Sequence, residues 1–166
     1  MEIIKKIGKD AGPVLRTLLQ DTALDNSYNY YILYMLGDIA DEGSQDLFSS
    51  FLEVEDPKLR AVAMRGISKL DPYLPLDKLM TYAEDENPSV RKYLAIALNN
   101  YKEPAVLTSL TGLLADNNFN VRFAASESLK NKGEQAKKPL LDLINNQDSY
   151  PEYASDLAGD VLEEGF

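Results

Sequence analysis

The sequence contains no cysteine and no histidine. Without cysteine the chain has no disulfide framework, no zinc–thiolate site and no thiolate nucleophile. Without histidine it lacks the usual general base near neutral pH and the commonest nitrogen ligand for metals. Any catalysis would have to depend on carboxylate, lysine, tyrosine or serine side chains. We therefore predict that the protein is not an enzyme and has no catalytic residue, metal ligand or cofactor.

Long apolar runs are also absent, so we expect no membrane-spanning helix. Residues 1–14 turn to charge after two isoleucines and lack the apolar core of a signal peptide, which favours a cytoplasmic protein. The formal net charge is −10. That balance argues against a nucleic-acid partner, because phosphate binding depends on clustered lysine and arginine. The expected partner is another protein.

The charge is unevenly distributed along the chain. No basic residue lies between Thr17 and Pro57, where only acidic charges occur, and the tail from Asp148 is likewise acidic only. One interpretation is a well-solvated surface. The other is that the acidic end helices attract a basic partner.

Three segments align without gaps at an offset of 31 residues: DPKLRAVAMRGISKL from Asp56, NPSVRKYLAIALNNY from Asn87 and NFNVRFAASESLKNK from Asn118. One further step back reaches Asp25. These four short polar residues are suited to cap helix N-termini. Behind each cap, apolar residues recur at i, i+4 and i+8, which predicts one buried helix face, with Tyr28 as its first member in the first repeat.

A second helix fits between successive capped helices. Phe48, Leu79, Leu110 and Leu141 share the 31-residue offset and form its apolar column. A first helix is expected at Pro13–Asp21, preceded by a short turn at 2–7, and Ser149 is in register as the last cap. The prediction is one all-α domain of five helix pairs, ten helices in total. The expected repeats are 9–41, 42–71, 72–102, 103–132 and 133–166.

A polar cap, often followed by proline, then V-R-x-x-A-x-x-A-L and a second apolar helix resembles a HEAT repeat; NPSVRKYLAIALNNYKEPAVLTSLTGLLAD is the best match. The short period is similar to the repeats of phycobilisome lyases. The resemblance implies a right-handed α–α superhelix, and for its function a protein-binding scaffold. It also implies that the recurring Arg60, Arg91 and Arg122 form a structural ladder with the caps Asp56, Asn87 and Asn118 of neighbouring repeats. The other interpretation of these arginines is a row of anion-binding groups.

In HEAT-like solenoids the capped helices line the concave side. Opposite the core stripe, two columns of residues would then face solvent, one through Ala61 and one through Arg65. The rich content of aromatic and basic side chains there is typical of an interface. The predicted partner-binding residues are Tyr30, Tyr34, Arg65, Lys92, Ile96 and Phe123. Of the neighbouring tyrosines, Tyr28 and Tyr31 are expected to pack in the core or between repeats.

The leading hypothesis is a non-catalytic scaffold that binds a segment of a partner protein along this concave face, as a monomer or as a subunit of a hetero-complex. The alternative is a bilin lyase-like or chaperone subunit that handles a tetrapyrrole or its carrier protein. The repeat type motivates it, and no individual residue does. A third possibility is that the chain is one segment of a longer solenoid.

Overall fold

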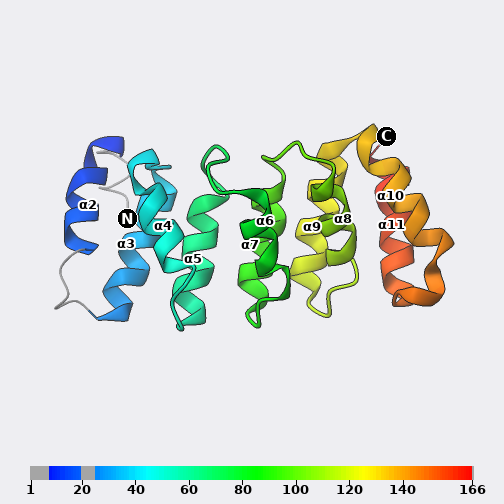
Figure 1. Cartoon of the computed structure of the whole chain (residues 1–166), viewed down its shortest axis with the longest axis horizontal. Helices are drawn as coiled ribbons and strands as arrows, with labels where there is room; N and C mark the ends of the chain where they lie inside the picture. Colours follow the sequence, from blue (N-terminus) through cyan, green and yellow to red (C-terminus); the bar gives the residue numbers. More distant parts are fainter. Residues whose placement is uncertain (1–7, 20–24, 166) are drawn as a thin grey trace. The chain divides into compact units, whose positions relative to one another are not determined.

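A computed structural model describes residues 8–19 and 25–165 of the chain. Within them the chain forms ten α-helices, short 3-10 turns and no strand (Figure 1). This confirms the prediction of an all-α chain of sequential helix pairs; the short turn expected at 2–7 lies outside the described residues. The chain divides into two compact units, Met1–Pro75 and Leu76–Phe166, and each is described by itself.

The first unit contains two helix pairs, α2 with α3 and α4 with α5. Its elements are η1 (Gly8–Ala11), α2 (Gly12–Leu19), α3 (Asn26–Asp38), η2 (Glu42–Ser44), α4 (Gln45–Phe51) and α5 (Pro57–Ile67). Helix α3 packs against both α2 and α5, and α4 packs against α5. The two capped helices α3 and α5 are therefore direct neighbours.

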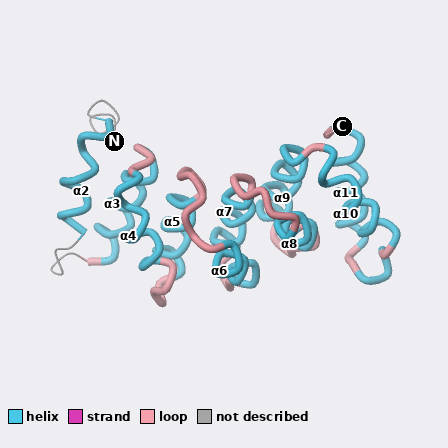
Figure 2. Tube along the Cα trace, turned by 45° about the horizontal axis from the view of Figure 1, so that its top comes forward, coloured by secondary structure: helices cyan, strands magenta, loops and turns pink. Residues whose placement is uncertain are grey.

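The second unit contains three helix pairs, α6 with α7, α8 with α9 and α10 with α11. Its elements are α6 (Leu76–Met80), η3 (Thr81–Glu84), α7 (Pro88–Leu98), α8 (Ala105–Leu113), α9 (Phe119–Lys132), α10 (Glu134–Asn145), η4 (Gln147–Ser149) and α11 (Glu152–Glu164). Helix α7 packs along α9, and α11 packs on both α9 and α10. Short loops, pink in Figure 2, join the helices.

The capped helices begin where the sequence predicts. In each, the capping side chain accepts a hydrogen bond from the backbone N–H two residues on, which satisfies one of the amides left unpaired at a helix start. The caps are Asp25, Asp56, Asn87 and Asn118, with N···O distances of 2.8, 2.8, 2.8 and 2.9 Å. The last predicted cap is wrong: α11 begins after Pro151 instead of Ser149. The chain forms a further 3-10 turn, η4, before that helix starts.

Small residues allow the helices of the first unit to approach closely. A β-carbon added to Gly66 in α5 would overlap the ring of Phe48, a fully buried residue of α4. One added to Gly37 in α3 would lie 3.2 Å from the α-carbon of Gly66. Glycine at 66 therefore lets both α3 and α4 pack directly on α5.

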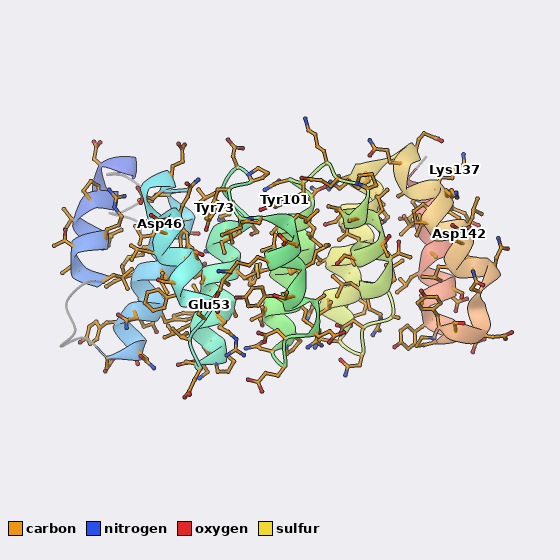
Figure 3. All side chains as sticks on the ribbon, in the orientation of Figure 1. Asp46, Glu53, Tyr73, Tyr101, Lys137 and Asp142 are labelled. Atoms are coloured by element: carbon orange, nitrogen blue, oxygen red, sulfur yellow. The ribbon has the colours of Figure 1, made fainter. Side chains whose placement is uncertain are left out.

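The apolar columns form the cores of the two units. Phe48, Leu79 and Leu110 are fully buried as predicted, but Leu141 is exposed and Leu140 is buried in its place. The cause is a shift of one residue in α10, which begins directly after Gly133. The positive φ of 57° at Gly133 ends α9 and redirects the chain. Figure 3 shows the side chains between the helices and labels Tyr73. The hydroxyl group of Tyr73 donates a hydrogen bond to the Gln45 carbonyl at 2.9 Å.

Polar bonds connect α9 to the preceding repeat of the second unit. The Ser128 hydroxyl donates to the Ala95 carbonyl of α7 at 2.9 Å. The Lys132 ammonium donates to the carbonyls of Asn99 and Tyr101 at 2.8 and 2.5 Å. Burial lowers the pKa of Lys132 below its ordinary value, against the nearby charge of Glu103. Lys132 thus binds the carbonyls of the C-cap of α7 and of the loop that follows it.

Candidate partner-binding surface

The three recurring arginines hold the loops that precede their own helices. In each case Nη1 donates to the carbonyl groups of the two residues before the cap. The acceptors are Val54 and Glu55 for Arg60 (3.0 and 2.7 Å), Asp85 and Glu86 for Arg91 (2.6 and 3.4 Å), and Asp116 and Asn117 for Arg122 (2.9 and 3.2 Å). The arginine of each of these three repeats therefore makes the same contact with the loop before its helix.

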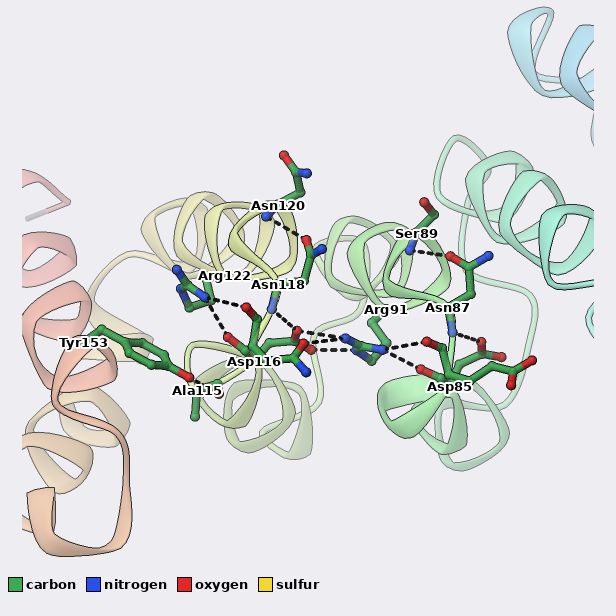
Figure 4. Close-up of polar contacts among 12 residues, drawn as sticks. Asp85, Asn87, Ser89, Arg91, Ala115, Asp116, Asn118, Asn120, Arg122 and Tyr153 are labelled. Atoms are coloured by element: carbon green, nitrogen blue, oxygen red, sulfur yellow. Dashed lines mark hydrogen bonds and ion pairs between the residues drawn. The ribbon is translucent and has the colours of Figure 1, made fainter.

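Arg91 also reaches the next repeat (Figure 4). Its Nε and Nη2 donate to the two carboxylate oxygens of Asp116 at 2.6 and 2.9 Å, and Nη2 also donates to the Asn117 side chain at 3.3 Å. The side chains of Arg91 and Asp116 are only 12% and 8% exposed. The partner carboxylate thus lies two residues before the cap Asn118, whose backbone N–H also donates to Asp116 at 2.8 Å.

The Arg91–Asp116 pair shifts the pKa of both groups. Burial acts to raise the pKa of the Asp116 carboxyl, but hydrogen bonds from Arg91 and the Asn118 N–H, with the charges of Arg91 and Arg122, outweigh it. The pKa of Asp116 therefore lies below its ordinary value. The hydrogen bond to Asp116 raises the pKa of Arg91. Both groups are ionised at neutral pH.

Arg122 has different surroundings at the next junction. Its guanidinium carbon lies 4.5 Å from the centroid of the Tyr153 ring, and the Tyr153 hydroxyl donates to the Ala115 carbonyl at 3.0 Å. Its Nε is buried without a hydrogen-bond partner among the described residues. An aromatic ring of α11 thus takes the place that a carboxylate occupies beside Arg91.

Two of the predicted partner-binding residues in the first unit contact each other. The Arg65 guanidinium lies 4.0 Å from the centre of the Tyr34 ring, and its Nη2 donates to Asp38 at 2.6 Å. Its side chain is 13% exposed. Burial acts to raise the pKa of Asp38, but the hydrogen bonds and charges of Arg65 and Lys69 lower it by more. The pKa of Asp38 therefore lies below its ordinary value. Arg65 is bound within the unit, whereas Tyr30 remains 36% exposed.

The tyrosines of α3 are more exposed than the sequence indicates. Tyr28 and Tyr31, expected to be packed, are 58% and 64% exposed. Successive residues of an i, i+4 stripe drift by about 40° around a helix. Tyr28 lies two such steps, about 80°, from the buried Leu36 and so falls outside the buried face. It also lies in the first repeat of the array, where neighbours cover less of a helix.

In the second unit the exposed predicted residue is Phe123 on α9, which is 56% exposed. Phe119, which the sequence analysis missed, is 65% exposed, and the two rings stack with centroids 6.3 Å apart. Their spacing of four residues on one helix is the signal that identifies such a pair. Lys92 and Ile96 on α7 are half-buried, and the Lys92 ammonium lies 5.1 Å from the centre of the Tyr93 ring.

The expected solvent-facing column through Ala61 is interrupted. Ala61 itself is buried, and Lys92 in the same column is only half-exposed, whereas Tyr30 and Phe123 reach solvent. Capped helices are flanked by neighbours, so a short side chain at this position is covered. In the column Tyr30, Ala61, Lys92 and Phe123, the exposed residues are therefore the two aromatic ones.

The second unit also has an open cavity of about 380 Å³ beside α8 and α10. Hydroxyl, amide and carboxylate groups line it together with apolar atoms, among them Thr111, Asp142, Asn146 and Tyr150.

Within residues 8–19 and 25–165, no three acidic side chains cluster as metal ligands would. Every helix in these residues is too short or too polar to cross a bilayer.

The geometry of capped helices, loop-binding arginines and paired helices can be compared with known families. A model of HEAT repeats matches residues 45–130 and again 76–155, two matches that begin one 31-residue repeat apart. The chain belongs to the HEAT repeat family. No curated protein matches this HEAT chain. HEAT repeats are generally protein-interaction scaffolds, and the family assigns no specific partner.

Proposed function

We propose that this HEAT chain is a non-catalytic scaffold that binds a segment of another protein through exposed aromatic side chains, which each unit presents separately, on α3 in the first unit and on α9 in the second. The observation that carries the proposal is the exposure of Tyr30 and Phe123, which occupy one column of the repeat. Tyr30 contacts the exposed Tyr31 in the first unit, and Phe123 stacks on the exposed Phe119 in the second. Exposed aromatic side chains that contact one another in this way are typical of interfaces, where they supply a large share of the binding energy.

The remaining predicted residues have supporting roles in this proposal. Tyr34 stacks against Tyr30 with ring centroids 6.4 Å apart, and Arg65 holds Tyr34 in place. Lys92 and Ile96 are half-buried on α7, the helix that packs along α9. The anchors are therefore Tyr30 and Phe123, with Phe119 added beside Phe123.

The proposal is tested by removing the exposed phenylalanines. Tagged wild-type protein and a Phe119→Ser, Phe123→Ser variant are used to capture partners from an extract of the source cell, followed by mass spectrometry. We expect the variant to lose the captured protein and to keep the wild-type melting temperature, because both side chains are exposed. The matched control is Leu141→Ser with Tyr150→Ser, which removes two other exposed apolar side chains of the same unit.

Capture of the same protein by wild type and by the Phe119, Phe123 variant would overturn the proposal. Arg65→Glu with Tyr34→Ala is a poorer test, because it would bring a second carboxylate against Asp38 and remove an internal stacking contact. A loss of capture would then be confused with a loss of folding. Substitutions at Phe119 and Phe123 avoid this confusion.

The bilin-lyase alternative rests on the short repeat period alone, and no described contact adds to it. Titration of the protein with a bilin, followed by absorbance, separates the two functions. A scaffold of the kind proposed leaves the bilin spectrum unchanged.

A further inference from the structure

The outward side of α3 is an aromatic surface, here called the tyrosine face, formed by Tyr28, Tyr30, Tyr31 and Tyr34. The first three are exposed, at 58%, 36% and 64%. Tyr30 contacts Tyr31 edge to face with ring centroids 5.5 Å apart and stacks with Tyr34 at 6.4 Å. The same helix buries Ile32, Leu33, Leu36 and Gly37. Tyr30, Tyr31 and Tyr34 therefore form one connected set of rings, and Tyr28 is exposed about one helical turn before Tyr31.

One guanidinium already lies on this face. Arg65 of α5 lies over the Tyr34 ring at 4.0 Å while its Nη2 donates to the Asp38 carboxylate at 2.6 Å. The aromatic ring supplies a negative π-face and the carboxylate supplies a full charge. At its C-terminal end, the tyrosine face therefore already binds a guanidinium group, between an aromatic ring and a carboxylate.

The other end of the face offers the same two kinds of group. Asp25 caps α3 within one turn of Tyr28, and its exposed carboxylate accepts the N–H groups of Ser27 and Tyr28 at 2.8 and 3.2 Å. Asn26 donates to a second carboxylate, that of Asp56, at 3.4 Å. No basic residue occurs in the sequence from Leu18 to Pro57. The N-terminal end of α3 thus has two carboxylates nearby, and residues 18–57, which include the exposed rings, contain no lysine or arginine.

We propose that the tyrosine face of α3 binds an arginine-rich segment of a partner protein. The proposal rests on the scaffold function above and names the chemistry of the partner. Guanidinium groups of the segment stack on Tyr28, Tyr30 and Tyr31 and pair with the carboxylates of Asp25 and Asp56. Arginine fits better than lysine because its planar group stacks on rings and forms two parallel bonds to a carboxylate. A second copy of the chain is disfavoured, since it has the same net charge of −10.

The test uses the full chain and three fluorescein-labelled peptides of equal length, in which glycine alternates with arginine, lysine or citrulline. Fluorescence anisotropy gives the dissociation constants. We expect the arginine peptide to bind, the lysine peptide to bind more weakly and the citrulline peptide, which has no charge, not to bind. A Tyr28→Ser, Tyr31→Ser variant should weaken arginine-peptide binding by about tenfold. The control Tyr150→Ser removes an exposed tyrosine of the other unit and should leave the constant unchanged.

Equal binding of the arginine and lysine peptides, undiminished in the Tyr28, Tyr31 variant, would overturn the proposal in favour of general charge attraction. A concentration-dependent dimer that the same variant abolishes would also overturn it, because a second copy would then cover the face. Failure here is distinguishable from failure of the scaffold function. If the arginine peptide does not bind but the Phe119, Phe123 variant still loses its partner, only the present inference is wrong.

Discussion

Two sets of side chains recur in the same 31-residue register but have opposite surroundings. The arginine column, Arg60, Arg91 and Arg122, is directed to loop carbonyls of the chain itself. The exposed aromatic residues, Tyr30 on α3 and Phe123 on α9, are directed to solvent. Recurrence alone therefore does not separate structural from functional positions. Exposure does: the arginines are half-buried and hydrogen-bonded to the backbone, whereas Tyr30 and Phe123 are exposed. Substitutions in the two sets should therefore have different effects.

The largest loss of stability is expected for Arg91→Ala. The substitution removes the paired donors from Asp116 and leaves a nearly buried carboxylate without its counter-charge. We expect the free energy of unfolding in urea to fall by about 3 kcal/mol. Arg91→Lys keeps the charge but cannot form the bidentate hydrogen bond with Asp116, so it should lower the free energy of unfolding by less. A change below about 0.5 kcal/mol for Arg91→Ala would contradict the structural role of the arginine column.

A smaller loss is expected for Arg122→Ala, which has no carboxylate partner of this kind. It loses two bonds to carbonyl groups and the contact with Tyr153, together about 1–2 kcal/mol. A double-mutant cycle with Tyr153→Leu measures the ring contact separately and should give a coupling of about 1 kcal/mol. A coupling of zero would mean that the ring only covers the guanidinium.

Acidification should affect the Arg91 junction through Asp116. The pKa of Asp116 in the folded chain is lower than its ordinary 3.8. Its contribution to stability is therefore fully present above that value and is lost as the pH falls below it, through the lowered pKa. Urea titrations at pH values on both sides of 3.8 check this. Asp116→Asn should flatten the acid side of the curve, and an unchanged slope would show that other carboxylates dominate.

The smallest effect on stability is expected for the exposed aromatic side chains. Phe119→Ser with Phe123→Ser should change the free energy of unfolding by no more than about 0.5 kcal/mol per site, because neither ring is buried. Thermal melting by circular dichroism measures this directly. A loss comparable to that of Arg91→Ala would place the two rings among the residues that hold the fold.

The fold could be predicted because its signals are local and repeated. Caps such as Asn87 and the i, i+4 apolar columns are properties of single helices, and four copies in one register reinforce one another. Exposure was harder to predict, since the covering of Tyr28 or Ala61 depends on neighbouring helices. Leu141 was assigned one residue out of place because α10 shifts register after Gly133.

The candidate site could be predicted in part. Tyr30 and Phe123 are exposed, but Arg65 pairs with Asp38. Asp38 lies one helical turn after Tyr34 and belongs to neither of the two solvent-facing columns that the sequence predicts. The resemblance implies that Arg91 pairs with a cap of a neighbouring repeat, whereas its carboxylate partner is Asp116. Asp85 and Asp116 share the 31-residue offset and precede their caps by two residues. That recurrence is the sequence signal that identifies Asp116.

The central claim is that a partner protein contacts the exposed aromatic side chains on the outer faces of the capped helices. Site-specific photocrosslinking tests it most directly, with a photoreactive phenylalanine analogue placed at Phe123 and, as control, at Leu141 of α10, which is also exposed. On irradiation in an extract of the source cell, we predict a crosslinked product from position 123 and none from position 141. The same product from both positions, or from position 141 alone, would contradict the claim.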